Sequence, residues 1–322
     1  MNTTLPVTVV TGFLGAGKTT LVNRWLADAR RGDVAVIVNE QGAVGIDGEL
    51  LAARARVLVE IAGGCVCCTT QAELVRALDQ LASSESPPAR ILIETSGAAS
   101  PAGVLRAIAR GGPEGTFALD GVITVVDASR VELLQEHELA LEQIGYADLV
   151  LLSRADVSTA EAMARARSWV EAQNGTAVVV ETAGGRADPC GLDGSLHRVL
   201  ALRRLDLPEP GRRPRTTTAH VYESVSLSAD GELDGERFAA FMEDELARFA
   251  GRIFRTKGIL AVAGLAQRMI VQGVADSVEI ELGEPWAETP RRSRLVVVGF
   301  GLDRDELECG FARCAAAPDE AT

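Results

Sequence analysis

The chain has 322 residues and a formal net charge of −13, and 47% of its residues are apolar. This length favours two domains over one, and the acidic balance argues against nucleic-acid partners and anionic membrane surfaces, which require clustered lysine and arginine. No apolar run is as long as a membrane span. The N-terminus leads directly into a strand pattern without the features of a signal peptide, so we expect a cytoplasmic protein.

A predicted phosphate-binding loop stands near the start of the chain. The apolar run 7–11 precedes GFLGAGKT, and a segment with helical spacing follows. This order predicts a Walker A loop, whose glycines bring backbone N–H groups to the phosphates. Lys18 is predicted to bind the β- and γ-phosphates, and Thr19 to supply a hydroxyl for Mg²⁺. The predicted nucleotide-binding residues here are Gly12, Gly15, Ala16, Gly17, Lys18, Thr19 and Thr20.

A second predicted strand, residues 34–39, ends in a polar loop. Glu40 follows it directly, and Asp47 lies further along the same loop. Open α/β sheets bind ligands at the carboxyl ends of their strands, so both carboxylates are candidates to face a metal ion or a nucleotide. A solvated loop accounts equally well for Asp47.

A third predicted strand, residues 57–61, leads into a cysteine-rich segment, GGCVCC at residues 63–68. Thr70 and Glu73 then form a capping-box pattern, which predicts a helix that starts just after the cysteines. A helix N-terminus lowers the pKa of nearby thiols and so favours the thiolate that binds metal.

Three thiols in this segment therefore indicate a transition-metal site. A single residue separates Cys65 from Cys67, so both thiolates could bind the same ion. Cys68, Glu40 or water would complete the set of ligands. Ligands on short loops favour an exchangeable ion over a structural one. The alternatives are small buried cysteines and a redox pair, although adjacent Cys67 and Cys68 could form only a strained disulfide.

A fourth predicted strand, residues 90–94, delivers Glu94 at its end, followed by Thr95-Ser96-Gly97. A carboxylate at this place in a Walker A protein is predicted to hold Mg²⁺ or to order the attacking water. The N–H of Gly97 could then hold the γ-phosphate, which would make this loop a nucleotide-sensing switch. Lys18, Glu94 and Gly97 are the predicted catalytic residues.

The predicted strand 149–152 ends in Ser153-Arg154-Ala155-Asp156. Asp156 can accept from N1 and N2 of guanine, a donor pair that adenine lacks, while the stem of Arg154 covers the base. Ser153, Arg154 and Asp156 are therefore predicted to bind the base of GTP. The rival interpretation is that Asp156 simply caps the following helix.

Strands alternating with helices predict a doubly wound, mostly parallel sheet of the P-loop NTPase kind, closed by a helix at residues 196–202. A proline-rich segment then marks a linker. Beyond it, alternating strands, a helix from about Glu236 with an aromatic stripe, and a capped helix after Asp303 predict a smaller α+β domain with an aromatic core. The predicted domains are 1–206 and 217–316, joined by the linker 207–216.

Together, GFLGAGKTTL, VNEQGAVGID, GGCVCCT and IETSG resemble, in order and spacing, the CobW-type P-loop GTPases, which belong to a group of metallochaperones. RTKG and RLVVVGFGLD extend this resemblance to the C-terminal domain. The resemblance implies GTP and Mg²⁺ as cofactors, with GTP hydrolysis coupled to binding and handing over a metal through CxCC thiolates. Thiolate chemistry favours Zn²⁺, with Co²⁺ or Fe²⁺ as alternatives. It also implies a client metalloprotein and a homodimer that forms around nucleotide.

The chain departs from the family pattern in three places. SRAD replaces NKxD, so Asp156 alone of the base-reading residues is retained, while Gln41 and Ala43 stand where Phe and Glu are frequent. Two other functions remain open. One is a P-loop kinase or ATPase with structural cysteines. The other is a nucleotide-dependent scaffold that matures a metalloenzyme, such as nitrile hydratase or a cobalt chelatase, without transferring metal.

Overall fold

The computed structural model of the chain describes residues 4–28, 34–40, 58–62, 68–109, 116–182, 222–274, 277–286 and 290–316. The chain divides into two compact units, Met1–Glu171 with Ala177–Arg204 and Leu205–Thr322 with Ala172–Thr176. The predicted linker 207–216 and the predicted helix 196–202 lie outside the described residues, and the domain bounds 1–206 and 217–316 stay predictions. Within the described residues, no helix is long and apolar enough to cross a membrane.

The first unit is built on a parallel sheet with the strand order β3-β2-β4-β1-β5-β6-β7. Its strands are β1 (Leu5–Thr11), β2 (Val34–Glu40), β3 (Leu58–Ala62), β4 (Arg90–Thr95), β5 (Phe117–Asp127), β6 (Leu149–Ser153) and β7 (Val178–Glu181). Its helices are α1 (Lys18–Asp28), α3 (Cys68–Ala82), α4 (Ala102–Ala109), α5 (Val131–Leu134), α6 (Glu138–Gly145) and α7 (Ala160–Gln173).

Helices cover both faces of this sheet. In β6, Leu149 and Leu151 pack in a buried cluster with side chains of α1. Val150 and Leu152, which alternate with them, pack in a second cluster with α6 and α7. Successive side chains of a strand point to opposite faces, so the apolar run of β6 is buried on both sides. The predicted doubly wound α/β fold is confirmed.

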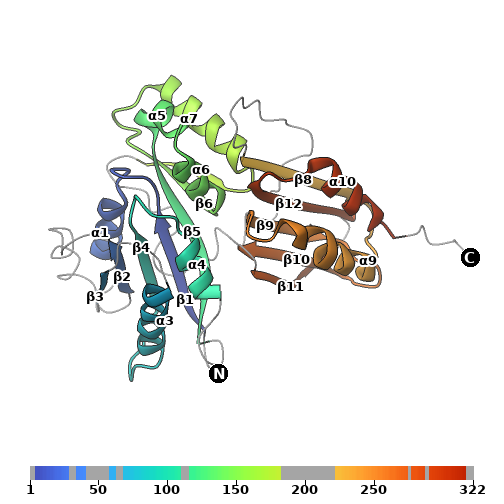
Figure 1. Cartoon of the computed structure of the whole chain (residues 1–322), viewed down its shortest axis with the longest axis horizontal. Helices are drawn as coiled ribbons and strands as arrows, with labels where there is room; N and C mark the ends of the chain where they lie inside the picture. The colour runs from blue at the N-terminus through green and yellow to red at the C-terminus, as the bar shows by residue number, and fades with distance from the viewer. Residues whose placement is uncertain are drawn as a thin grey trace, which may run out of the picture. The chain divides into compact units, whose positions relative to one another are not determined.

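Strand β1 lies between β4 and β5 in the middle of the sheet (Figure 1). Val10 of β1 is level with Glu94 of β4, so β4 delivers its carboxylate beside the start of the glycine-rich loop. All described strands of this sheet are parallel, and their carboxyl ends therefore meet at one edge. That edge is where open α/β sheets bind ligands.

A buried ion pair ties the three central strands together. Arg90, at the start of β4, donates to Asp120 of β5 over 3.0 Å, and the two side chains are only 7% and 4% exposed. Thr8 of β1 accepts from Arg90 at 3.3 Å and donates to Asp120 at 3.2 Å. These contacts fix the strands whose far ends carry the predicted site.

The second unit is an antiparallel sheet, β11-β10-β9-β12-β8, packed against helices. Phe238, Phe241 and Phe311 contact one another within the cluster that joins helices to sheet. The aromatic stripe is thus core, and the predicted smaller α+β domain is confirmed. Its elements are β8 (Tyr222–Asp230), α9 (Gly235–Ala240), β9 (Ile253–Leu260), β10 (Gln267–Val274), β11 (Ser277–Pro285), β12 (Arg292–Phe300) and α10 (Arg304–Arg313).

Two helix predictions need correction. Helix α3 begins at Cys68 rather than after Thr70, so Cys68 is its first residue and not a residue ahead of it. Residues spaced like Thr70 and Glu73 also lie one turn apart inside a helix, and the spacing alone cannot mark the start. After α9 the chain continues as a π-helical turn, Phe241–Glu245, and a 3₁₀ turn, Leu246–Phe249, instead of one regular helix. The predicted cap of the last helix is confirmed, because Asp303 accepts from the N–H of Glu306 at 3.0 Å.

We expect Asp120→Ala to lower the free energy of unfolding by about 3–5 kcal/mol, because it leaves the buried Arg90 guanidinium without its carboxylate. Urea denaturation followed by circular dichroism measures the change. The control is Glu132→Ala, which breaks the pair of Glu132 and Arg165, two side chains that are 64% and 57% exposed. Exposed pairs contribute little, so this variant should keep the wild-type midpoint. Equal midpoints for both variants would contradict the role given to the buried pair.

Candidate functional site

A loop built on glycine connects β1 to α1, whose first residue is Lys18. Gly12, Gly15 and Gly17 have φ angles of 135°, 74° and 102°, which other residues rarely adopt. At Gly12 a Cβ would also overlap the carbonyl oxygen of Val125 in β5. The conformation therefore requires these glycines, and it leaves the N-terminus of α1 directed at the loop, as a phosphate site needs.

Lys18 folds back over its own loop and is buried. Its Nζ donates to the carbonyl oxygens of Gly12 at 2.9 Å and Phe13 at 3.4 Å. Gly97, in the loop after β4, approaches the same place: a Cβ there would lie 2.9 Å from Lys18 Nζ and 2.7 Å from the backbone nitrogen of Leu14. The structure thus brings two of the three predicted catalytic residues together.

Thr19 and Glu94 meet directly. The hydroxyl of Thr19 donates to Oε1 of Glu94 at 2.6 Å, and the Glu94 side chain is buried at the end of β4. Hydroxyl and carboxylate oxygens are the protein ligands that Mg²⁺ prefers, usually together with water and phosphate oxygens. This donor set therefore fits the predicted ion.

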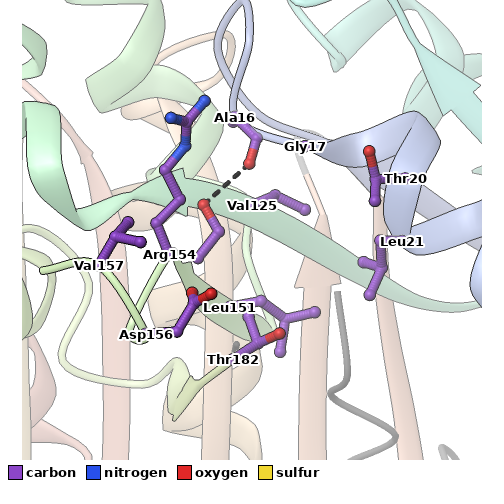
Figure 2. Close-up of a pocket in the computed structure, with 11 residues that line it drawn as sticks. Ala16, Gly17, Thr20, Leu21, Val125, Leu151, Arg154, Asp156, Val157 and Thr182 are labelled. Carbon is purple, nitrogen blue, oxygen red and sulfur yellow. Dashed lines mark hydrogen bonds between the residues drawn. The ribbon is translucent and has the colours of Figure 1, made fainter. Parts of the chain in front are cut away.

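Next to the glycine-rich loop lies a cavity of about 250 Å³. Figure 2 shows Arg154 and Asp156 on one side of it and residues of α1 on the other. Much of the lining is apolar, as suits the flat face of a base, with one carboxylate among it. The lining residues are Ala16, Gly17, Thr20, Leu21, Val125, Leu151, Ser153, Arg154, Asp156, Val157 and Thr182.

Ser153 and Arg154 connect this cavity to the phosphate loop. The Ser153 hydroxyl lies 2.9 Å from the carbonyl oxygen of Ala16, to which it donates (Figure 2). The Arg154 guanidinium pairs with Asp127 at 3.0 Å and donates to the carbonyl oxygen of Gly15 at 3.4 Å. Its φ of 64° makes Arg154 the only described non-glycine residue with a positive φ. Such backbone strain costs about 1–3 kcal/mol and tends to gather at functional sites.

The alternative role for Asp156, that of a helix cap, is filled by another residue. Helix α7 begins at Ala160, and the hydroxyl of Thr159 accepts from the N–H of Ala162 at 3.2 Å. Asp156 lies three residues earlier, in the turn that lines the cavity.

Sequence reasoning missed Asp127 and Arg130. Asp127 is buried at the end of β5, and besides pairing with Arg154 it accepts from the backbone and hydroxyl of Ser129 at 3.0 and 2.6 Å. Its place at the carboxyl end of a strand is the same signal that identified Glu94. Arg130 Nη1 lies 3.7 Å from where a Cβ of Gly15 would be, an approach that no sequence pattern indicates.

The structure describes only part of the predicted transition-metal site. Cys65, Cys67 and Asp47 lie outside the described residues, and for Glu40 and Cys68 only the backbone is described. Within the described part of the chain, no cluster of three or more His, Cys, Asp or Glu side chains could hold a metal ion. The backbone does place Glu40, at the end of β2, in register with Ala62, at the end of β3. Ala62 is three residues before Cys65 in the sequence, so the strand that leads to the cysteines ends beside Glu40.

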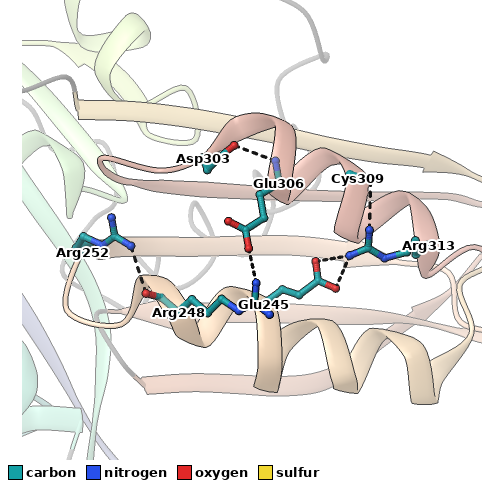
Figure 3. A network of polar contacts seen from close by, with 7 residues as sticks. All are labelled: Glu245, Arg248, Arg252, Asp303, Glu306, Cys309 and Arg313. Carbon is teal, nitrogen blue, oxygen red and sulfur yellow. Dashed lines mark hydrogen bonds and ion pairs between the residues drawn. The ribbon is translucent and has the colours of Figure 1, made fainter.

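A second cavity, of about 610 Å³, lies in the second unit between the turns after α9 and helix α10. Figure 3 shows Glu245 accepting two hydrogen bonds from Arg313, each 2.8 Å, with Cys309 on the same guanidinium. Burial raises the pKa of the neighbouring Cys314 to about 11. That thiol stays protonated at neutral pH and is a poor metal ligand, consistent with leaving it out of the predicted ligands.

We expect Gly97→Ala to weaken binding of a triphosphate nucleotide at least about tenfold, because its methyl group would displace Lys18 Nζ or Leu14. Titration with a fluorescent nucleotide analogue measures the affinity. Ala98→Ser adds an atom at the next position, which is exposed, and should bind like the wild type. Unchanged binding by Gly97→Ala would mean that the loop after β4 can move away from Lys18 and Leu14 without cost.

Comparisons with known proteins agree with this geometry. Residues 6–181 match the family model "CobW/HypB/UreG, nucleotide-binding domain", and residues 222–315 match "Cobalamin synthesis protein cobW C-terminal domain". The chain is 35% identical to the zinc chaperone CobW of Pseudomonas aeruginosa, with 93% of this chain and 88% of that protein covered. It is 30% identical to the zinc chaperone YjiA of Escherichia coli, over 96% of this chain and 98% of that protein.

A crystal structure of the Zn(II)-bound YjiA GTPase from E. coli superimposes with a TM-score of 0.72 at 26% identity, covering 98% of this chain and 100% of that one. Both units of the fold are therefore shared with that protein. The chain belongs to the CobW/HypB/UreG family of nucleotide-binding proteins and carries the cobW C-terminal domain.

Proposed function

We propose that the chain is a GTP-hydrolysing metallochaperone, which binds a transition metal through its CxCC segment and delivers it to a client metalloprotein. Zinc is the favoured cargo, because thiolates suit it and the relatives above are named zinc chaperones. The observation that carries the proposal is that the glycine-rich loop, Glu94 and the end of β3, which precedes the cysteine segment in the sequence, lie at one edge of a single sheet.

The contacts described above support our proposal for the phosphate end of the site. Lys18 would exchange its bonds to loop carbonyls for the β- and γ-phosphates, while backbone N–H groups of the glycine loop bind the other phosphate oxygens. Thr19 and Glu94 would hold Mg²⁺, which would supply positive charge to neutralise part of the phosphate charge. Gly97 adjoins Lys18 closely enough to respond to a γ-phosphate at that position.

The base end is assigned to the cavity beside α1. Asp156 is the carboxylate in its lining, and it would accept from the two guanine N–H groups. Ser153 and Arg154 contact the glycine loop, since they donate to the carbonyl oxygens of Ala16 and Gly15. We therefore assign GTP selectivity to Asp156, and the linkage between the base and phosphate subsites to the two residues before it.

Strand register supports coupling between nucleotide and metal. β2 lies between β4 and β3, with Asn39 level with Thr95 on one side and Glu40 level with Ala62 on the other. The nucleotide-sensing loop leaves β4 after Thr95, and the cysteine segment leaves β3 after Ala62. Ordering of the loops by GTP would complete the thiolate site, and hydrolysis would remove the contacts that held them, so that a client can take the metal.

We expect a non-hydrolysable GTP analogue with Mg²⁺ to tighten Zn²⁺ or Co²⁺ binding at least about tenfold over GDP, because only the triphosphate holds the sensing loop. Competition titration of the reduced protein, following thiolate-to-cobalt absorption, gives the affinities. Linkage requires the metal to tighten analogue binding by the same factor.

Cys65→Ser with Cys67→Ser should abolish the thiolate band while GTP binding persists. Cys309→Ser removes an exposed thiol of the second unit and should leave the band unchanged. A band that ignores the nucleotide would exclude the coupling. No band at all, together with retained client binding by the double variant, would favour the scaffold function without metal transfer.

We expect Asp156→Ala to weaken GTP binding at least about tenfold and to remove the preference for GTP over ATP, because the guanine N–H groups lose their acceptor. Competition of GTP and ATP against one fluorescent analogue measures both effects. Glu171→Ala, an exposed carboxylate on α7, is the matched control. Equal losses for GTP and ATP would show that Asp156 does not read the base.

A further inference from the structure

The sensing loop between β4 and α4 has little freedom at its far end. The carbonyl of Ser96 accepts from the N–H of Ala99 at 3.2 Å, and the Ser100 hydroxyl accepts from the N–H of Ala102 at 3.1 Å, at the start of α4. Gly97 lies within the first of these turns, against Lys18. Whatever fixes residues 99 and 100 therefore also fixes the approach of Gly97 to the phosphate loop.

Two consecutive side chains of helix α6 hold this far end. The Ser100 hydroxyl donates to Oε1 of Glu142 at 2.5 Å, and Nε2 of Gln143 donates to the carbonyl oxygen of Ala99 at 3.2 Å. The backbone carbonyl of Gln143 in turn accepts from the Thr124 hydroxyl of β5 at 2.7 Å. Gln143 therefore binds both β5, through its backbone carbonyl, and the loop after β4, through its side chain.

The other end of α6 contacts the phosphate loop. His137, the residue just before the helix, stacks on Phe13 with ring centroids 4.9 Å apart and an interplanar angle of 25°. Phe13 is the residue whose carbonyl oxygen accepts from Lys18. One short helix therefore touches both loops that meet at Lys18 and Gly97.

Burying the polar side chains of Glu142 and Gln143 on α6 costs free energy. Gln143 is fully buried, and among the described residues its Oε1 has no hydrogen-bond partner. Burial raises the pKa of Glu142, while the Ser100 hydrogen bond and the charge of Arg106 lower it. An apolar pair would satisfy packing without an unpaired acceptor, so stability alone does not explain a carboxylate and an amide at these positions.

We infer that Glu142 and Gln143 are positioning residues for the nucleotide-sensing loop: they hold Ser100 and Ala99 so that Gly97 stands against Lys18. This inference rests on the proposed GTP hydrolysis. It gives a functional role to α6, a helix that lies outside the sequence motifs from which the site was predicted.

A double-mutant cycle on Ser100 and Glu142 tests the inference. Ser100→Ala and Glu142→Ala should each lower kcat for GTP about five- to tenfold and leave KM within about twofold, since the groups that bind phosphate and base are untouched. The double variant should be no slower than Ser100→Ala, because that substitution already removes the bond that Glu142→Ala removes. Glu142→Gln should restore kcat, since its amide oxygen still accepts from Ser100.

Gln143→Met keeps the side-chain volume and removes the donor to Ala99, so it should show the same loss of kcat. This variant replaces Glu142→Ala in the test if Glu142→Ala does not fold. Glu136→Ala, an exposed carboxylate before α6, should behave like the wild type. Amide hydrogen exchange of residues 96–101 without nucleotide should quicken at least about tenfold in Glu142→Ala and stay at the wild-type rate in Glu142→Gln.

Failure of the proposed GTP hydrolysis and failure of the positioning role give different results. If the wild type neither binds nor hydrolyses GTP, the proposed function is wrong, and the exchange rates alone decide whether α6 holds the loop. If the wild type hydrolyses GTP normally but the two substitutions add independently, or kcat does not change, the positioning role is overturned and the proposed function stands.

Discussion

The close approach of Gly97 to Lys18 is the constraint on which the site depends. A side chain at position 97 would press on the ammonium group and on the backbone of Leu14, so the loops after β1 and β4 can meet only through glycine. The approach also requires the glycine loop to curl back far enough for its own carbonyls to accept from Lys18. A phosphate that draws Lys18 away from those carbonyls would therefore change the contact between Lys18 and Gly97 directly. No long-range pathway is needed for the phosphate to affect the loop after β4.

Sheet topology turns this local contact into a larger arrangement. The buried Arg90–Asp120 pair and Thr8 fix three central strands near their amino ends. Their carboxyl ends carry Glu94, the glycine loop and Asp127, while β2 and β3 extend the same edge toward the cysteine segment. The buried contacts that fix these strands thus lie toward the opposite end of the sheet from the glycine loop.

Polar groups that are costly to bury gather around this edge. Asp127 is buried and pairs with Arg154, whose backbone is held in a strained conformation beside the base cavity. Gln143 is buried on α6 with an unpaired oxygen among the described contacts. Asp127, Arg154 and Gln143 each make contacts that hold a loop in place. The second unit has an aromatic core, and its ion pairs of Arg248 with Glu306 and of Arg313 with Glu245 each have an exposed arginine.

The sequence by itself determined the parallel doubly wound fold, the glycine loop and the carboxylate at the end of β4, because strand periodicity and phosphate chemistry act over a few neighbouring residues. It also indicated the family, through motifs in a fixed order. It misplaced the start of α3, since one residue spacing serves both a cap and a helix interior. Only the tertiary structure decided that Thr159 rather than Asp156 caps α7, that Arg154 pairs with Asp127, and that α6 contacts the loop between β4 and α4. Such contacts join residues far apart in the chain, and no local pattern specifies which strands and helices will be neighbours.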